Sequence, residues 1–384
     1  MERIETLISK RTKAGLLRTL HPIDARSEGR LLRSGKVLLD FSSNDYLALS
    51  THPTMKEAGQ RAIEALGTGA TASRLLSGDL ELHHELERRT AHFKGKPAAL
   101  VLNSGYQANV GIISVLCQKG DLVLCDRLCH ASILDGIRLS HAGFHRFIHN
   151  DMNHLERLLQ KTQAQSGHRM VITESVFSMD GDRAPLKQIV ELKERYGFSL
   201  YVDEAHATGV FGDHGAGVVE QEGITDQVDF IMGTFSKALG SFGAYVACSQ
   251  LDKTYLINAC RSFIYSTALP PAVIASNIAA LKIIETEPER RTTLLRNAEQ
   301  FRTALKAKGL EVLGESQIIP VVTGETTRTL KVSQALQDSG CWVLPIRAPT
   351  VPAGSARLRF TVTHWHDQSV LGPLSEQVGA LCHA

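Results

Sequence analysis

Over roughly 250 residues, this chain alternates short apolar runs rich in β-branched side chains with amphipathic stretches of helical length. Such alternation is typical of βαβ units, which build a mostly parallel sheet with helices packed on its faces. Stretches 153–163 and 184–197 are among the predicted helices. The predicted strands are 98–103, 121–126, 145–150, 169–175, 199–205, 229–234, 244–249 and 262–267.

The pattern changes near Pro288, where a long helical stretch leads to the segment 310–324, another helix, and strands at 341–347 and 356–363. The N-terminal end has helical spacing and then a short strand, KVLLDFSS. With 384 residues the chain is long enough for a large core and a smaller second domain. We therefore predict an α/β protein with a mostly parallel mixed sheet between helices. Its predicted parts are an N-terminal arm and short strand (1–45), a large domain (46–287) and a smaller C-terminal α/β domain (288–384).

The charge balance excludes some classes of partner. The 42 basic and 40 acidic residues give a net charge of +2, so no general attraction to nucleic acid or to an anionic membrane is expected. No apolar run approaches the ~20 residues that span a bilayer, and the N-terminus lacks the apolar core of a secretory signal. A cytoplasmic location is the expectation.

The seven cysteines are scattered, which indicates reduced thiols in a reducing compartment rather than disulfides. Cys125, Cys129 and His130 form the one cluster that invites a metal hypothesis. A zinc site needs three or four ligands with suitable spacing, and no second pair of ligands accompanies this cluster or the pair His364 and His366. We expect no metal.

Two strand ends together suggest a cofactor. The segment DFIMGTFSK ends in Lys237, where a lysine that forms a Schiff base would lie, and SLYVDEAH places Asp203 at the end of another apolar strand. Pyridoxal phosphate needs a lysine for its aldehyde and a carboxylate beside its pyridine nitrogen. A solvated lysine and a helix-capping aspartate are the alternatives when either residue is considered alone.

Further polar residues follow other predicted strands, and ligands of open parallel sheets collect at such ends. Gly105 and Tyr106 open a helix whose backbone amides suit a phosphate. His130 could cover a flat ring, and Ser178 and His206 follow two more strands. Helix capping, or a histidine packed in the fold or exposed to solvent, is the alternative for each side chain.

The segment GTGATA resembles a dinucleotide-binding fingerprint through Gly67, Gly69 and Ala72. That fingerprint should follow a strand, whereas the preceding residues 53–66 have helical spacing. We therefore expect a loop near a ligand or a subunit boundary, and not a nicotinamide site.

The motifs together resemble the α-oxoamine synthases, which are pyridoxal phosphate enzymes of fold type I. The resemblance covers almost the whole chain. It rests on FSSNDYLALS, GTGATASRLLSGDLELHHELE, NSGYQAN, DRLCHAS, ESVFSMDGD, VDEAHATGVFG and GTFSKALGSFGAY. It implies that Lys237 bonds the cofactor, Asp203 meets its ring nitrogen, His206 its phenolic oxygen, and His130 stacks on the ring. Gly105, Tyr106, Ser178 and Thr234 fall on cofactor-binding positions.

The segment CWVLPIRAPTVPAGSARLRFTVTHWH resembles the family member of biotin synthesis, although Ala348 replaces a usual proline. The resemblance implies condensation of L-alanine with a pimeloyl thioester, on coenzyme A or acyl carrier protein, with loss of carbon dioxide. Arg18, His130, Arg347 and Thr350 then bind substrate, and the protein is a homodimer with active sites at the subunit boundary.

Two alternatives remain at this point. A sister enzyme such as 2-amino-3-ketobutyrate CoA ligase, which joins glycine to acetyl-CoA, shares the cofactor motifs; the RAPTVP segment argues against it. A catalytically silent partner subunit would keep the fold without the cofactor, and the joint presence of Lys237, Asp203, His130 and His206 argues against that.

Overall fold

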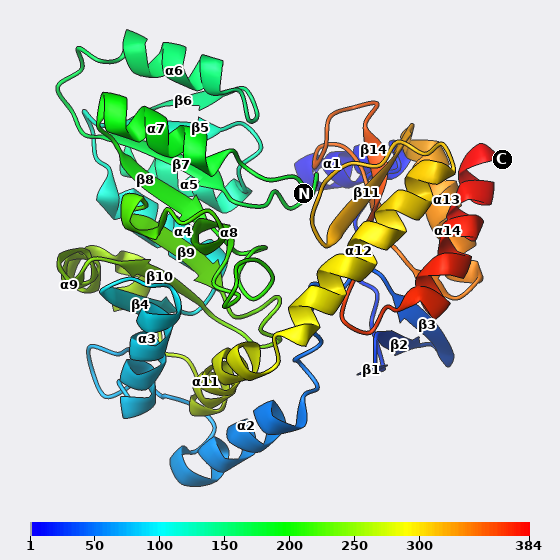
Figure 1. Ribbon diagram of the computed structural model, residues 1–384, viewed down its shortest axis with the longest axis horizontal. Helices are drawn as coiled ribbons and strands as arrows, with labels where there is room; N and C mark the ends of the chain where they lie inside the picture. The colour runs from blue at the N-terminus through cyan, green and yellow to red at the C-terminus, as the bar shows by residue number, and fades with distance from the viewer. Residues whose placement is uncertain (1) are drawn as a thin grey trace. The chain divides into compact units, whose positions relative to one another are not determined.

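Figure 1 shows the computed structural model of the protein, which describes residues 2–384. The chain divides into two compact units. The first unit contains the chain as far as Tyr46, together with Met179–Asp182 and Thr292–Ala384, and the second contains Leu47–Ser178 and Arg183–Arg291. These units are defined by packing and not by independent folding, so the domain boundaries expected at residues 46 and 288 stay a prediction.

The second unit is built on a seven-stranded mixed sheet, ordered β4-β10-β9-β8-β7-β5-β6. Neighbouring strands are parallel except at β10, which runs antiparallel to both β4 and β9. Most of these strands are buried along their whole length, as expected when helices cover both faces of a sheet. The strands are β4 (Ala98–Leu102), β5 (Leu122–Asp126), β6 (Gly143–Phe147), β7 (Arg169–Glu174), β8 (Ser199–Asp203), β9 (Phe230–Thr234) and β10 (Ala244–Cys248).

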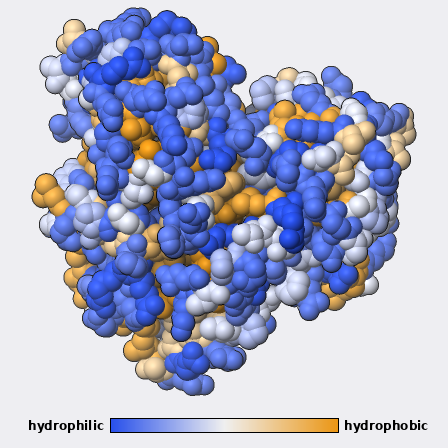
Figure 2. All heavy atoms as spheres, viewed as in Figure 1, coloured by the Kyte–Doolittle hydropathy of each residue, from blue (hydrophilic) through white to orange (hydrophobic). Residues whose placement is uncertain are grey.

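Several helices cover this sheet with apolar side chains. Ile112 of α4 and Ile133 of α5 join the core formed with the strands, while α6 buries Leu155 and Leu159. The opposite side of α6 is polar, and the face in Figure 2 is largely hydrophilic over that helix. The helices of the second unit are α2 (Pro53–Leu66), α3 (Glu81–Phe93), α4 (Gly105–Leu116), α5 (Ala131–Ser140), α6 (Met152–Lys161), α7 (Leu186–Tyr196), α8 (Val218–Gln221), α9 (Gln250–Ala259), α10 (Arg261–Ile264) and α11 (Pro271–Thr286).

The predicted α/β architecture and its mixed, mostly parallel sheet are confirmed; of the strands predicted for this sheet, one is wrong and one is shifted. Residues 262–267 were expected to form a strand, but they begin in helix α10 and continue as a turn and coil. From that helix, Phe263 buries its ring in the core that the strands of the sheet share. An apolar run alone could not distinguish a helix from a strand here, because either can place apolar side chains in a core. Strand β6 begins two residues before the predicted segment 145–150.

The first unit holds two small sheets, β1-β2-β3-β12 and β11-β14-β13. Their strands are β1 (Ala25–Ser27), β2 (Arg30–Arg33), β3 (Lys36–Asp40), β11 (Ile318–Gly324), β12 (Cys341–Trp342), β13 (Pro345–Ile346) and β14 (Ala356–Thr361). The single strand predicted at 341–347 is wrong, because β12 pairs with β3 and β13 pairs with β14. Between them, the carbonyl of Val343 accepts a hydrogen bond from Ser333, and the amide of Leu344 donates to Ser42.

The remaining helices are α1 (Glu2–Lys13), α12 (Glu289–Ala307), α13 (Thr326–Asp338) and α14 (Gln368–His383). The helix expected near the N-terminus and the long helix expected after Pro288 are both present. None of the helices described in residues 2–384 is long and apolar enough to cross a membrane.

Candidate functional site

A cavity of about 250 Å³ lies in the second unit, beside the carboxyl ends of β7, β8 and β9 and the first residues of α4 and α5. This is the edge at which ligands of open α/β sheets bind. The structure brings seven of the eight predicted cofactor residues to its wall: Gly105, Tyr106, His130, Asp203, His206, Thr234 and Lys237. Within the part of the chain that the structure describes, the lining does not include Ser178, which follows β7 by four residues.

The N-terminus of α4 forms one end of this cavity. Ser104 caps the helix by accepting a hydrogen bond from the backbone amide of Gln107 at 3.2 Å. Gly105 and Tyr106 then occupy the first helical turn, where backbone N–H groups have no partner within the helix. Together with the helix dipole, these groups form a site suited to an anionic group such as a phosphate.

Asp203 provides a fixed carboxylate in the cavity wall. It ends β8 with only 5% of its surface exposed. One oxygen accepts a hydrogen bond from Asn109 Nδ2 and the other from the amide of Ala205, both at 2.9 Å. Because both oxygens are held by the protein, the carboxylate keeps one orientation and can meet a cationic ring N–H of a ligand.

A second carboxylate, Glu174, lies beside Asp203 because the two residues are in register on the neighbouring strands β7 and β8. Burial raises the pKa of Glu174 well above its ordinary value, and the adjacent Asp203 raises it further. Its Oε1 accepts a hydrogen bond from the backbone amide of His130 at 2.5 Å. Glu174 therefore fixes the main chain that carries His130.

Lys237 lies three residues after the end of β9, and its amine is 2.8 Å from His206 Nε2. The hydroxyl of Thr234 holds this loop by donating to the carbonyl of Gly243 at 2.8 Å and by accepting from the amide of Ser236. Gly240 lies three residues after Lys237 and has a φ of 64°. A Cβ at this position would come within 2.3 Å of the backbone of Ser50. The loop can therefore take this path only with glycine at 240.

His130 caps α5 and lines the cavity. Its Nδ1 is 2.8 Å from the hydroxyl of Ser132, and the ring meets the edge of Tyr106 with centroids 6.2 Å apart. Desolvation by the surrounding protein lowers the pKa of His130; the charge of Asp203 opposes this effect and the charge of Lys237 adds to it. An uncharged imidazole at this wall is suited to lie against a flat ring.

The predicted substrate residues of the first unit line a cavity of their own, of about 890 Å³. Arg18, Arg347 and Thr350 all belong to its wall, and Arg347 donates a hydrogen bond to the carbonyl of Leu17 at 3.3 Å. Arg11 and His21 line it as well, and the described lining contains no aspartate or glutamate. This cavity is therefore basic and suited to an anionic ligand.

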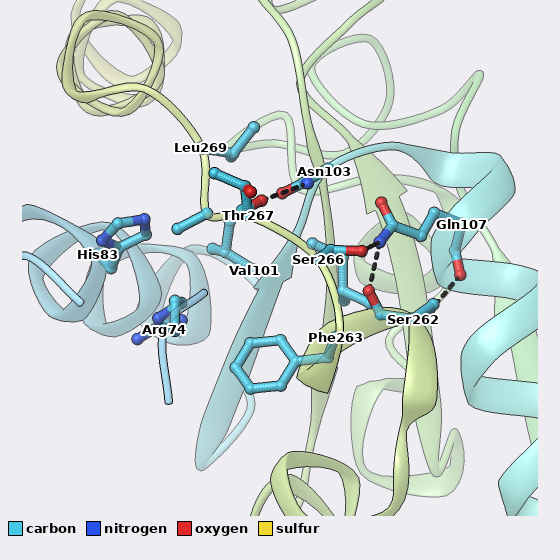
Figure 3. A pocket seen from close by; sticks show the side chains of 12 residues that line it. Arg74, His83, Val101, Asn103, Gln107, Ser262, Phe263, Ser266, Thr267 and Leu269 are labelled. Atoms are coloured by element: carbon cyan, nitrogen blue, oxygen red, sulfur yellow. Dashed lines mark hydrogen bonds between the residues drawn. The ribbon is translucent and has the colours of Figure 1, made fainter. Parts of the chain in front are cut away.

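A third, much smaller cavity of about 10 Å³ lies between β4, the start of α4 and the segment 262–269 (Figure 3). Asn103 donates to the carbonyl of Thr267 at 2.8 Å, and Gln107 donates to Ser266 at 2.7 Å and to the carbonyl of Ser262. Its volume has room for about one water molecule, so it is no substrate site.

Two expectations concern sites of other classes. The segment GTGATA follows helix α2 and not a strand, which removes the context a dinucleotide fingerprint requires. Across residues 2–384, no three histidine, cysteine or acidic side chains are placed to hold a metal ion. All seven cysteines are free and buried, and burial raises the pKa of Cys125 to about 12.

Asn109, Ser132 and Glu174 line the cavity and were not predicted as site residues. Glu174 ends a strand, so the rule that found Asp203 could have found it as well. Asn109 and Ser132 lie inside α4 and α5, and although both end motifs that carry the family resemblance, their residue types alone do not separate them from ordinary polar residues of a helix.

Comparisons with known proteins show the family of the chain. The family model described as aminotransferase class I and II matches residues 36–371. A curated 8-amino-7-oxononanoate synthase of Geotalea daltonii is 48% identical over 373 residues, covering 96% of this chain and 94% of that protein. A solved serine palmitoyltransferase from S. paucimobilis, which holds PLP joined to myriocin, has a TM-score of 0.93 at 32% identity, covering 98% of this chain and 96% of its own. A solved 8-amino-7-oxononanoate synthase from Francisella tularensis has a TM-score of 0.78 at 29% identity, covering 89% of this chain and 97% of its own.

Proposed function

The chain belongs to the aminotransferase class I and II family, and from this premise we propose that it is a pyridoxal phosphate-dependent acyltransferase acting as an 8-amino-7-oxononanoate synthase in biotin biosynthesis. Its substrates are L-alanine and a pimeloyl thioester. The observation that carries this assignment is identity of 48% to a synthase of that name over 96% of the chain, together with a cavity that holds Lys237 and Asp203.

The residues of the cavity fit the cofactor. Asp203 offers a buried carboxylate for the ring nitrogen, and Lys237 offers an amine for the aldehyde. The amides of Gly105 and Tyr106 suit the phosphate, and His130 and His206 suit the ring face and the phenolic oxygen. When bound, pyridoxal phosphate supplies an aldehyde that takes up an amine and a ring that accepts electron density from the α-carbon of an amino acid.

The chain's own groups then move protons and orient the substrates. Lys237 Nζ takes the proton from the α-carbon of alanine, with His206 Nε2 at 2.8 Å as its neighbour. The α-carbon forms a bond to the acyl carbon, the carbon–sulfur bond breaks, and the thiol leaves with a proton. The carboxylate of alanine departs as carbon dioxide, and a proton returns to the α-carbon.

Arg18, Arg347 and Thr350 are the proposed contacts of the acyl substrate. They line a basic cavity of about 890 Å³, which suits an acyl chain that ends in a carboxylate. A guanidinium can bind such a carboxylate with two parallel hydrogen bonds. Ser178 stays a proposed cofactor residue on the resemblance alone.

A homodimer is the proposed assembly. Several large apolar side chains of the second unit are exposed: Leu76 is 80% exposed, Tyr265 72%, Leu75 51%, and Tyr106 of the cavity wall 50%. A second copy is the proposed cover of these side chains, in keeping with the homodimer that the family resemblance implies. We propose a cytoplasmic location because all seven cysteines are free.

The test is thiol release from pimeloyl-CoA by the protein loaded with pyridoxal phosphate, with Lys237→Ala as the control. Release should require L-alanine and Lys237, and borohydride should attach the cofactor to Lys237. Release with glycine and acetyl-CoA in place of both substrates would reassign the chain to a sister enzyme. Equal turnover in Lys237→Ala would refute the assignment of the site.

A further inference from the structure

A chain of hydrogen bonds connects His130 to Asp203. Asn109 Nδ2 donates to Asp203 at 2.9 Å and to the hydroxyl of Ser132 at 3.0 Å, and that hydroxyl is 2.8 Å from His130 Nδ1. Asn109 is 1% exposed and Ser132 is fully buried, so water does not compete for the two bonds of Asn109, while the bond between Ser132 and His130 is partly buried. The direction of each bond can therefore be worked out from its neighbours.

The orientation of Asn109 is fixed from both ends. A carboxylate only accepts hydrogen bonds, so the side chain must turn its NH₂ group toward Asp203. Its oxygen, at the other end, accepts a hydrogen bond from the hydroxyl of Tyr201 at 2.8 Å. Burial raises the pKa of Tyr201 well above its ordinary value, so that hydroxyl keeps its proton and donates it.

The orientation of Asn109 decides the orientation of Ser132. Because Asn109 donates to the hydroxyl of Ser132, the proton of that hydroxyl is free to go to His130 Nδ1. The backbone amide of Ser132 also donates to Nδ1, at 3.3 Å. Two donors thus face this nitrogen at the positive end of α5, and a proton on Nδ1 would repel both.

The charged groups that face the His130 ring are Asp203 of β8, Lys237 after β9 and Asp135 of α5. Glu174 of β7 accepts a hydrogen bond from the backbone amide of His130. Asp203 and Asp135 favour a second proton on the ring, whereas Lys237 and desolvation disfavour it, and the net effect lowers the pKa of His130. The ring is therefore neutral near pH 7.

We propose that Asn109 and Ser132 are positioning residues that fix His130 as the tautomer with its proton on Nε2. In that tautomer, His130 donates a hydrogen bond into the cavity and does not act as a proton acceptor. The recipient is an oxygen of the substrate carboxylate or thioester; that part of the inference rests on the proposed function.

The first test observes the ring directly, by NMR of the cofactor-loaded protein labelled with ¹⁵N-histidine. The His130 signal is identified by its loss in His130→Asn. Two-bond couplings distinguish the two ring nitrogens, and at pH 7.5 the proton should be on Nε2. A proton on Nδ1, or on both nitrogens, would overturn the proposal. The spectrum does not depend on substrate, so failure of the proposed function would leave this result unchanged.

The second test removes the hydroxyl with Ser132→Ala. The control is Ser140→Ala, a buried serine of the same helix that bonds only backbone groups of α5 and its end. Loss of the donor to Nδ1 should move the titration midpoint of His130 to higher pH, populate the other tautomer and lower kcat/KM about fivefold, because one hydrogen bond is lost. Ser140→Ala should leave the His130 spectrum unchanged. An unchanged His130 spectrum in Ser132→Ala would also overturn the proposal; if this variant does not fold, the wild-type spectrum decides alone.

Discussion

Replacing Lys94 with methionine should destabilise the second unit more than the loss of an exposed ion pair would. Lys94 is 3% exposed, and its amine donates to Glu204 at 2.7 Å, to the hydroxyl of Thr208 at 3.3 Å and to the carbonyl of Ala216. Burial acts to lower the pKa of Lys94, but the charges of Glu204 and Tyr245 and the hydrogen bonds to both side chains together more than offset it, and the pKa is raised. The amine is therefore charged in the folded protein.

The expected magnitude follows from the burial of both partners. Their side chains are 1% and 0% exposed, so Lys94→Met leaves the Glu204 charge in the core with the amide of Val219, at 3.0 Å, as a remaining donor. Removing one partner of a buried pair costs about 3–5 kcal/mol. In a domain of roughly 150–250 residues each kcal/mol lowers Tm by about 2–4 °C, so the calorimetric transition should fall by roughly 6–20 °C.

The assay is differential scanning calorimetry at one fixed excess of pyridoxal phosphate, since a bound ligand raises Tm. Arg89→Met is the matched control. Arg89 pairs with Glu85 at 2.8 Å, but the side chains are 48% and 35% exposed, so its loss should cost less than about 1 kcal/mol. The double variant Lys94→Met/Glu204→Gln should regain most of the lost stability, because no unpaired charge is then buried. A shift for Lys94→Met no larger than that for Arg89→Met would refute the reasoning.

Two further predictions concern acid stability and assembly. Burial lowers the pKa of His366 to about 4, below the value near 6.5 of an unfolded histidine. As the pH falls, the unfolded state therefore binds a proton at a higher pH than the folded state does, and the free energy of unfolding should fall by about 3 kcal/mol between pH 6.5 and 4. In His366→Asn, the free energy of unfolding from urea titrations should depend less steeply on pH. An unchanged pH dependence would count against the burial argument. Leu76, 80% exposed, lies in the proposed dimer surface. Leu76→Lys should shift sedimentation velocity profiles toward monomer, whereas a monomeric wild-type protein would exclude the dimer.

The local sequence was sufficient to predict the strands that are buried on both faces. Strands such as β5 and β8 are buried on both faces, so their apolar runs stand out without knowledge of their neighbours. Asp203 and Lys237 could be placed in one cavity because both follow parallel strands of one sheet. The family resemblance supplied the remaining roles.

The elements that were missed depend on partners distant in the chain. The segment 341–347 forms two strands instead of one, because β12 pairs with β3 and β13 pairs with β14. Neither pairing can be read from the sequence of the segment itself. Asn109 becomes a site residue only because Tyr201 and Asp203 lie against it across the fold. Such contacts are set by tertiary packing and not by propensity.

The position of β10 in the sheet determines when the cavity can form during synthesis. In the described sheet β4 has β10 as its single neighbour, and β10 connects it to β9. Strand β4 therefore has no partner in the sheet until Ala244–Cys248 has left the ribosome, although helix α4, which follows it, also packs against α5. A nascent chain that stops before Ala244 therefore has Asp203 and Lys237 but lacks the strand that connects β4 to the rest of the sheet, so we expect the finished cavity only after β10 has been synthesised.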